Sequence, residues 1–200
     1  MTKTLTENER KMLLVAARKA IEDRVVKGVL PQPDVEKFPP LLRKKGACFV
    51  TLMKADALRG CVGSLEAERP LIADVCDRAA AAAVNDFRFP PVSREELPEI
   101  SIEISRLTSP ELLAYQEPEE LPGLLHPGKD GVVLSYGPRK ATFLPQVWKK
   151  LPEPEIFLDR LCLKMGLEPS FWRKNLLGVE IYQVEKFSEE ELTDRDLSGN

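Results

Sequence analysis

Alternating apolar and polar residues predict several strands that each bury one face. Residues 100–105 read Ile-Ser-Ile-Glu-Ile-Ser, and successive side chains of a strand point to opposite faces of a sheet. Residues 179–187 alternate in a similar way and predict a final strand. The apolar, partly β-branched run over residues 47–54 is typical of a largely buried strand. A short connection at Ala55-Asp56 leads from it into residues 58–62, which predicts a β-hairpin.

Before and between these strands, start and stop residues predict three helices. Thr6 and Glu9 have the spacing of a capping box, an apolar face follows them, and Gly28 supplies a C-terminal stop. Pro70 is suited to the start of a second helix, whose alanine-rich composition lets it lie close against a sheet. Pro154 can open a third helix near the end of the chain.

The order of these elements indicates an α+β protein. A second hairpin is predicted where Gly137-Pro138-Arg139 separates two apolar runs, residues 132–136 and 140–144. Because most of the predicted strands pair as hairpins, with helices between them in the sequence, we expect an antiparallel or mixed sheet covered by helices. We expect one core with a smaller lobe attached. Residues 188–200 are acidic and nearly free of large apolar side chains, so they are predicted to be a frayed tail.

Composition and charge narrow the classes of partner. The chain has 200 residues and a formal net charge of −3, which argues against nucleic acid as a partner, because binding to its phosphates needs a basic face. No apolar run approaches the roughly 20 residues that span a bilayer, and a charged amphipathic stretch stands where a signal peptide would have its apolar region. We therefore expect a cytoplasmic protein with four reduced cysteines. There is no C-x-x-C pair, so neither a metal site nor a cofactor is expected.

Two glycines beside a strand direct attention to one segment. Gly60 and Gly63 each forgo about 0.5–1 kcal/mol relative to alanine, and the usual compensation is a close approach of a ligand or another chain. Cys61 lies between them and follows Arg59, whose guanidinium would favour a thiolate, so Cys61 is a candidate nucleophile. Adjacent strand residues face opposite ways, however. The residues by themselves favour the alternative, in which Arg59 faces solvent and Cys61 fills space in the core.

Asp86 and Arg88 stand at the end of the alanine-rich helix. An arginine there can hold a carboxylate or a phosphate through two hydrogen bonds, which would make the pair a site for a small anionic ligand. The same two residues can equally form a local ion pair that orders the turn before Pro90. Ser93 and Glu96 have the spacing of a further capping box.

Residues 126–131 read His-Pro-Gly-Lys-Asp-Gly and predict turns. The functional alternative makes His126 a general base for Cys61 and Asp130 a ligand-binding residue. Cys48 and Cys61 would face each other if the hairpin connection holds an even number of residues. Burial of Cys48 as a small apolar residue is the simpler interpretation.

The segment Leu58-Arg59-Gly60-Cys61-Val62-Gly63 resembles the six-residue signature of the AMMECR-type domain family, known in prokaryotes as AmmeMemoRadiSam system protein A. Val62 stands where that family usually has isoleucine, which removes one methylene and nothing else. Further segments share the resemblance, which covers the chain from about Leu13 to Phe187: residues 46–52, 85–90, 128–131 and 143–147.

The resemblance implies an α+β fold with a larger and a smaller lobe in a single domain, here residues 1–187. It also implies association with a Memo-like protein and a radical-SAM protein, but it supplies no reaction. Two functions therefore stay open: a small-molecule binding or catalytic pocket at this segment, or a non-catalytic adaptor module for a protein partner. The pocket would use Cys61 and Arg59 for chemistry and the following residues for binding: Gly60, Gly63, Asp86, Arg88 and Asp130.

Overall fold

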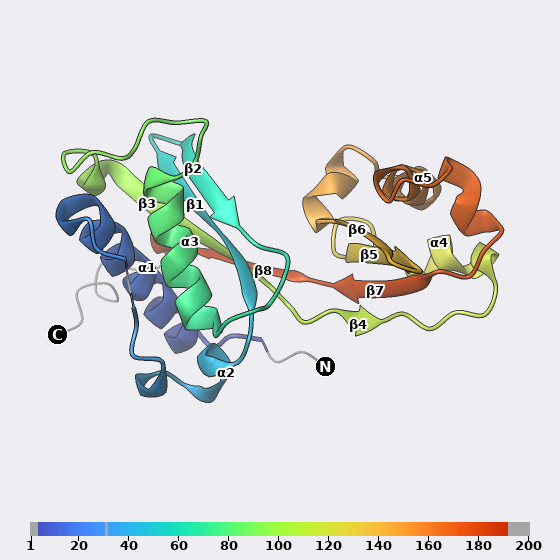
Figure 1. Cartoon of the computed structure of the whole chain (residues 1–200), viewed down its shortest axis with the longest axis horizontal. Coiled ribbons are helices and arrows are strands. Elements are labelled where there is room, and N and C mark those ends of the chain that lie inside the picture. The colour runs from blue at the N-terminus through green and yellow to red at the C-terminus, as the bar shows by residue number, and fades with distance from the viewer. Residues whose placement is uncertain (1–3, 31, 192–200) are drawn as a thin grey trace. The chain divides into compact units, whose positions relative to one another are not determined.

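The chain folds into two compact units, each with its own sheet and core. The computed structural model describes residues 4–30 and 32–191. Unit 1 takes the chain up to Leu107 and again from Glu185, and unit 2 comprises Thr108–Val184 (Figure 1). Each unit has a four-stranded sheet and a separate cluster of buried apolar residues. The predicted α+β class with a larger and a smaller lobe is confirmed, but the expectation of one core is wrong because each sheet buries its own.

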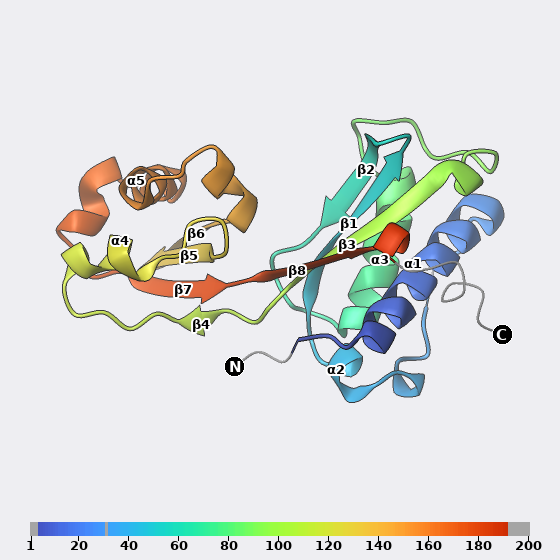
Figure 2. The ribbon, with the colours of Figure 1, turned by 180° about the vertical axis from the view of Figure 1, so that it is seen from behind.

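The sheet of unit 1 carries two helices on one of its faces. Its strand order is β2-β1-β3-β8, and β1 pairs antiparallel with both β2 and β3. Helices α1 (Glu7–Lys27) and α3 (Leu71–Val84) pack against each other and against these strands. Figure 2 shows the sheet from the side opposite these two helices. The four strands are β1 (Ala47–Lys54), β2 (Ala57–Gly63), β3 (Ile100–Leu107) and β8 (Val184–Ser188).

The predicted signals at the ends of α1 are confirmed. Thr6 and Glu9 form the capping box in both directions, and Gly28 adopts the left-handed conformation with φ 69° that ends a helix. Helices in the described ranges include none long and apolar enough to cross a membrane. The described part of the segment before β1 contains a short 3-10 turn (Val35–Lys37) and the one-turn helix α2 (Pro40–Arg43).

The predicted β1–β2 hairpin is also confirmed. Ala55 and Asp56 have φ values of 47° and 61°, the left-handed values that suit a two-residue turn between twisted antiparallel strands. Beyond the turn, Met53 pairs with Leu58 but Leu52 pairs with Gly60. Arg59 is therefore the extra residue of a β-bulge, which bends the strand and changes the direction of a side chain.

Gly60 lets α3 lie close against the sheet. A Cβ atom at this position would overlap the carbonyl oxygen of Ala82 and would lie 3.2 Å from its carbonyl carbon. The alanine-rich face of α3 brings the helix backbone this near, as Ala79, Ala82 and Ala83 are buried. The close approach that the glycine permits is thus that of the chain's own helix.

The final predicted strand, residues 179–187, is in fact two strands. β7 (Gly178–Tyr182) belongs to the sheet of unit 2, and β8 belongs to that of unit 1. They separate at Gln183, whose N–H donates to Thr108 Oγ1 and whose carbonyl oxygen accepts from the Thr108 N–H, both over 2.8 Å. An alternating pattern specifies which side chains are buried but not which sheet a strand joins, and the break could not be read from it.

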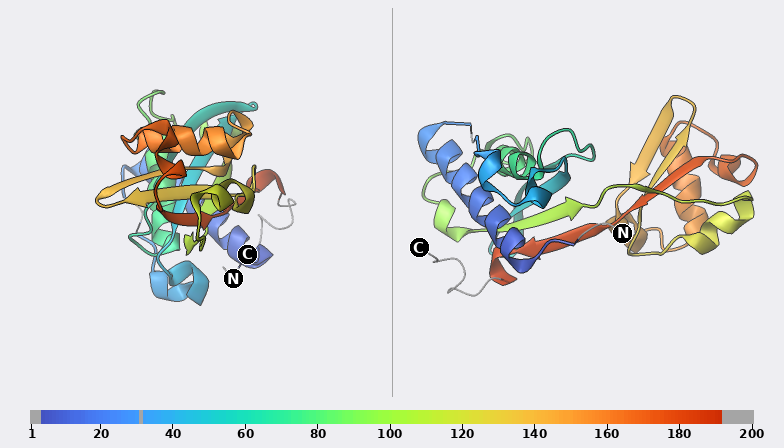
Figure 3. Two further views of the ribbon diagram at one scale, coloured as in Figure 1. Left: turned by 90° about the vertical axis from the view of Figure 1, so that its right-hand side faces the viewer. Right: turned by 90° about the horizontal axis from the view of Figure 1, so that it is seen from below.

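The sheet of unit 2 has the order β4-β7-β5-β6, and its apolar core lies between the sheet and α5 (Pro154–Lys164) (Figure 3). The predicted second hairpin and the helix opened by Pro154 are both confirmed. Within the core, Trp148 stacks on Phe157 with ring centroids 3.7 Å apart. The remaining elements are β4 (Glu111–Leu112), β5 (Gly131–Tyr136), β6 (Arg139–Phe143) and α4 (Leu121–Leu124).

Residues at the start of the predicted frayed tail are held in place. Ser188 still belongs to β8, and Glu189–Glu191 form a 3-10 turn. The carboxylate of Glu189 pairs with Arg18 of α1 and accepts the N–H of Ile102 over 2.9 Å. The predicted tail thus begins too early in the chain, while residues 192–200 lie outside the described residues.

Gly60→Ala is expected to lower the free energy of unfolding of unit 1 by about 1–3 kcal/mol, because the added methyl group overpacks the contact with Ala82. Chemical denaturation followed by far-UV circular dichroism measures this change. Tryptophan fluorescence would report on the other unit, because Trp148 and Trp172 both lie in unit 2. Gly123→Ala is the matched control, as a Cβ atom there meets nothing within 4 Å. A Gly60→Ala variant as stable as the wild type would contradict this account of the glycine.

Candidate functional site

Residues 58–63 form most of the edge strand β2. Because Gly60 faces α3, the next residue, Cys61, faces the opposite side of the sheet, where its strand partner is Thr51. The Thr51 hydroxyl donates to Cys61 Sγ over 3.3 Å. Cys48 is buried in the core beside the helices, so the two thiols do not face each other. Gly63, in turn, leaves the room that the ring of Phe49 occupies.

Asp86 and Arg88 bind the peptide groups of Cys61. The Cys61 N–H donates to Asp86 Oδ2 over 2.8 Å, and Arg88 Nη2 donates to the Cys61 carbonyl oxygen over 3.3 Å. Arg88 also holds both oxygens of Asp86, with Nε 2.9 Å from Oδ1 and Nη2 2.6 Å from Oδ2. The Arg88 guanidinium, helped by the N–H of Cys61, holds the pKa of the buried Asp86 far below its usual range.

This arrangement, the Asp86–Arg88 clamp, covers part of an exposed sheet edge. An edge strand presents unpaired N–H and C=O groups, which proteins protect with charged or covering side chains. Here a carboxylate and a guanidinium take the place of a neighbouring strand at Cys61. The geometry therefore supports the ion-pair interpretation of Asp86 and Arg88, with the fork of Arg88 already occupied by Asp86.

Phe87 lies between the two clamp residues and is 97% exposed. Asp86 and Arg88 both direct their side chains to β2, so the intervening side chain points away from the strand into solvent. Phe87 was not among the site residues predicted from the sequence. The available signal was a large apolar residue between two charged ones, in a segment that ends in Pro90-Pro91.

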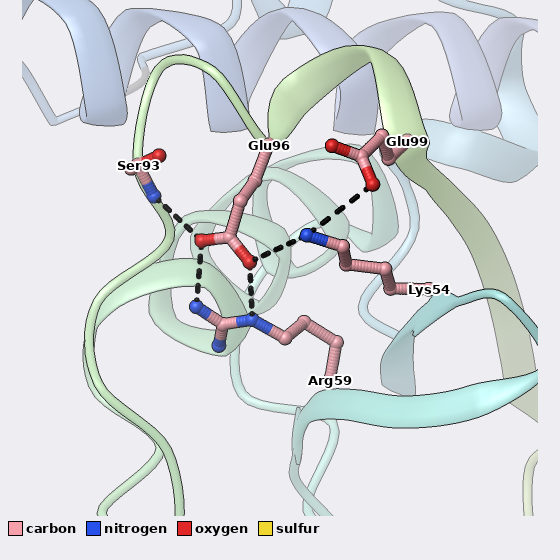
Figure 4. A network of polar contacts seen from close by, with 5 residues as sticks. All are labelled: Lys54, Arg59, Ser93, Glu96 and Glu99. Atoms are coloured by element: carbon pink, nitrogen blue, oxygen red, sulfur yellow. Dashed lines mark hydrogen bonds and ion pairs between the residues drawn. The ribbon is translucent and has the colours of Figure 1, made fainter.

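Arg59, which also belongs to β2, takes part in an ion-pair network with Glu96, Lys54 and Glu99 (Figure 4). Its Nη2 and Nε atoms lie 3.0 and 3.1 Å from the two carboxylate oxygens of Glu96. Glu96 Oε2 also accepts the N–H of Ser93 over 3.0 Å, which is half of the predicted capping box. Lys54 Nζ lies 3.3 Å from both Glu96 and Glu99. Arg59, more than any other neighbour, lowers the pKa of Glu96 to about 2.

These contacts alter the predicted role of Arg59. Its side chain is only 11% exposed and its guanidinium is bound to Glu96, so the contacts do not support its predicted action on the Cys61 thiol. The guanidinium carbons of Arg59 and Arg88 lie 6.0 and 5.5 Å from the ring centroid of Phe89, distances at which a cation is attracted to an aromatic ring. Residues 86–96 are thereby tied to β2 at Asp86, Phe89 and Glu96.

Asp130 and His126 belong to unit 2 and form the predicted turn. Asp130 is 1% exposed; its Oδ2 accepts the His126 N–H over 2.8 Å and lies 3.1 Å from His126 Nδ1. The Asp130 carbonyl oxygen accepts the indole N–H of Trp148 over 2.7 Å. These bonds account for Asp130 as a turn-forming residue. Across the described residues, no three or more His, Cys, Asp or Glu side chains are placed to hold a metal ion.

The chain is similar to a family model, to curated proteins and to a solved structure. The family model described as AMMECR1 matches residues 14–187. A protein of Thermofilum pendens is 37% identical, over 92% of each chain, and Protein MJ0810 of Methanocaldococcus jannaschii is 39% identical, over 80% of this chain and 81% of its own. The crystal structure of Uncharacterized Protein PH0010 from Pyrococcus horikoshii is similar, with a TM-score of 0.74 and 35% identity. That match covers 93% of this chain and 94% of the other.

Cys61 is expected to be the first cysteine that an alkylating reagent modifies in the native protein. The other three thiols are buried, and burial raises the pKa of Cys76 to about 12 and also raises that of Cys48 and Cys162. Site-resolved mass spectrometry should find Cys61 modified at least about 10-fold faster, since buried thiols react only through local opening. Equal rates for all four would contradict the burial pattern.

Glu96→Gln is expected to destabilise unit 1 by about 1–3 kcal/mol at neutral pH, because it removes charged hydrogen bonds to Arg59. The folded pKa of about 2 lies below the ordinary 4.5, so the contribution is present above the ordinary value and is lost as pH falls toward 2. Denaturation curves should therefore converge for wild type and variant between about pH 5 and about pH 2. Glu36→Gln, at an exposed ion pair with Arg43, should have little effect at any pH.

Proposed function

This chain belongs to the AMMECR1 family, and on that premise we propose that it is a binding module for a protein partner, with Phe87 as the anchor of its binding surface. The observation that carries the proposal is the 97% exposure of Phe87 in a segment that is otherwise firmly held. Aromatic side chains that insert into a partner's apolar pocket contribute much of the energy at protein interfaces.

The exposure of Phe87 follows from the clamp and not from a lack of local structure. Asp86 and Arg88 are fixed to β2 on either side of it, and Phe89 is partly buried beside two guanidinium groups. A side chain presented by an ordered segment loses little conformational freedom on binding, which favours affinity. A partner protein with an apolar pocket that accepts one phenyl ring fits this surface.

The same contacts support a binding role over thiol catalysis. Arg59 and Arg88 were the groups predicted to activate Cys61 and to orient an anionic ligand, and each holds a carboxylate of this chain through two hydrogen bonds. His126 and Asp130, the other predicted contributors, already bind each other within unit 2. We infer that Cys61 acts mainly through its peptide group.

The first partners to test are the Memo-like and radical-SAM companion proteins that the resemblance of the sequence implies. A second candidate function is a small-ligand site on the sheet face that carries Cys61, and it is favoured by the partial exposure of this thiol and the hydroxyl of Thr51 beside it. Cys61→Ser separates the two functions, because it removes the thiol and keeps the peptide contacts with Asp86 and Arg88.

Phe87→Ala is expected to weaken binding of the partner by about 30-fold or more, the effect of removing a central aromatic anchor. Its stability should stay within about 0.5 kcal/mol of the wild type because the side chain is in solvent. Calorimetric titration of the purified Memo-like and radical-SAM proteins from the same organism measures the effect.

Leu112→Ala is the control, since it removes another exposed apolar side chain, in unit 2, and should leave binding unchanged. Cys61→Ser should also bind normally. Failure of the wild type to bind either protein, or full affinity in Phe87→Ala, would refute the proposed function.

A further inference from the structure

We propose that Arg59 is a positioning residue that holds the segment of residues 86–96 in its binding conformation and thereby sets the affinity of the Phe87 surface. The inference rests on the proposed function, because it concerns the same surface. It gives Arg59 a role that neither the thiol nor the solvent-facing interpretation of this residue contained.

The bulge in β2 makes this role possible. Arg59 is the unpaired residue between Leu58, which pairs with Met53, and Gly60, which pairs with Leu52. A bulge redirects the side chain of its extra residue, and here the guanidinium reaches Glu96 in the connection between α3 and β3 (Figure 4). The hairpin is thereby joined to Glu96, which follows Arg59 by 37 positions in the sequence.

Glu96 is the point at which the far end of the segment is fixed. Its carboxylate accepts from Arg59 twice, from the Ser93 N–H and from Lys54. The near end is fixed by the clamp at Asp86, and the guanidinium of Arg59 also lies over Phe89, between the two ends. Without Arg59, Glu96 would keep the Ser93 N–H and the Lys54 contact but lose both guanidinium hydrogen bonds, and Phe89 would lose one of its two cationic neighbours.

The forked geometry of arginine is required at this position. A lysine would keep the positive charge but could not donate to both oxygens of one carboxylate from a planar group, and it would stack less well on Phe89. Arg59→Lys therefore tests whether the two hydrogen bonds of the guanidinium hold the segment in place, because the positive charge is kept. Because a loosened segment presents Phe87 correctly for only part of the time, the apparent dissociation constant rises in inverse proportion to that fraction.

Hydrogen–deuterium exchange is the direct test. In Arg59→Lys and in Glu96→Gln, which breaks the same contact from the other side, backbone amides of residues 86–96 should exchange about 10-fold faster than in the wild type. Elsewhere in unit 1, amides that exchange through local opening should keep their rates, and only those that exchange through unfolding of the whole unit should speed up, by no more than the loss of stability accounts for. Arg43→Lys, at the exposed ion pair with Glu36, is the matched control and should leave exchange unchanged both in residues 86–96 and in the rest of unit 1. Unchanged exchange in residues 86–96 of both variants would overturn the inference.

Affinity for the same companion proteins is the second measurement. Arg59→Lys should weaken binding about 10-fold, and should add nothing further in a Phe87→Ala background, because the side chain that it positions is then absent. Faster exchange with unchanged affinity would overturn the inference while leaving Phe87 as the anchor. Full affinity in Phe87→Ala would instead refute the proposed function, and this inference with it.

Discussion

The backbone of Cys61 is the point on which the candidate surface depends, because it lies at the open edge of a sheet. Its N–H and C=O groups have no strand to pair with, and the Asp86–Arg88 clamp supplies the missing partners. Satisfying these two backbone groups fixes the direction of the Asp86 and Arg88 side chains, and Phe87, which lies between them, is left in solvent. The protection of the edge and the presentation of an aromatic ring are thus the same arrangement.

A second constraint comes from the covered face of the sheet. α3 approaches so closely that only glycine fits at position 60, and the bulge beside it releases Arg59 toward Glu96. The cost of two glycines in one strand is offset within the fold, by the helix at Gly60 and by the Phe49 ring at Gly63. A ligand is not needed to explain either of them.

Local signals in the sequence sufficed for the elements but not for their partners. Three predictions are confirmed because each depends on residues that are neighbours in the chain: the capping box at Thr6, the turn at Ala55-Asp56 and the strand that begins at Ile100. The pairing of Arg59 with Glu96 depends on a bulge and on contacts between distant residues, which periodicity does not encode. The break at Gln183 was missed for a related reason, since its two halves alternate alike. Phe87 was overlooked because exposure is a property of the fold and not of residue type.

Five residues of the six-residue signature have identifiable roles in the structure. Gly60 and Gly63 make room for a helix and a ring, Val62 packs against the core, and Arg59 binds Glu96. The backbone N–H and C=O groups of Cys61 anchor the clamp, and its side chain accepts a hydrogen bond from the Thr51 hydroxyl. If the segment existed for thiol chemistry, its charged neighbour should face the thiol. Instead Arg59 is directed to the segment that carries Phe87, which is what a surface built to present that ring requires.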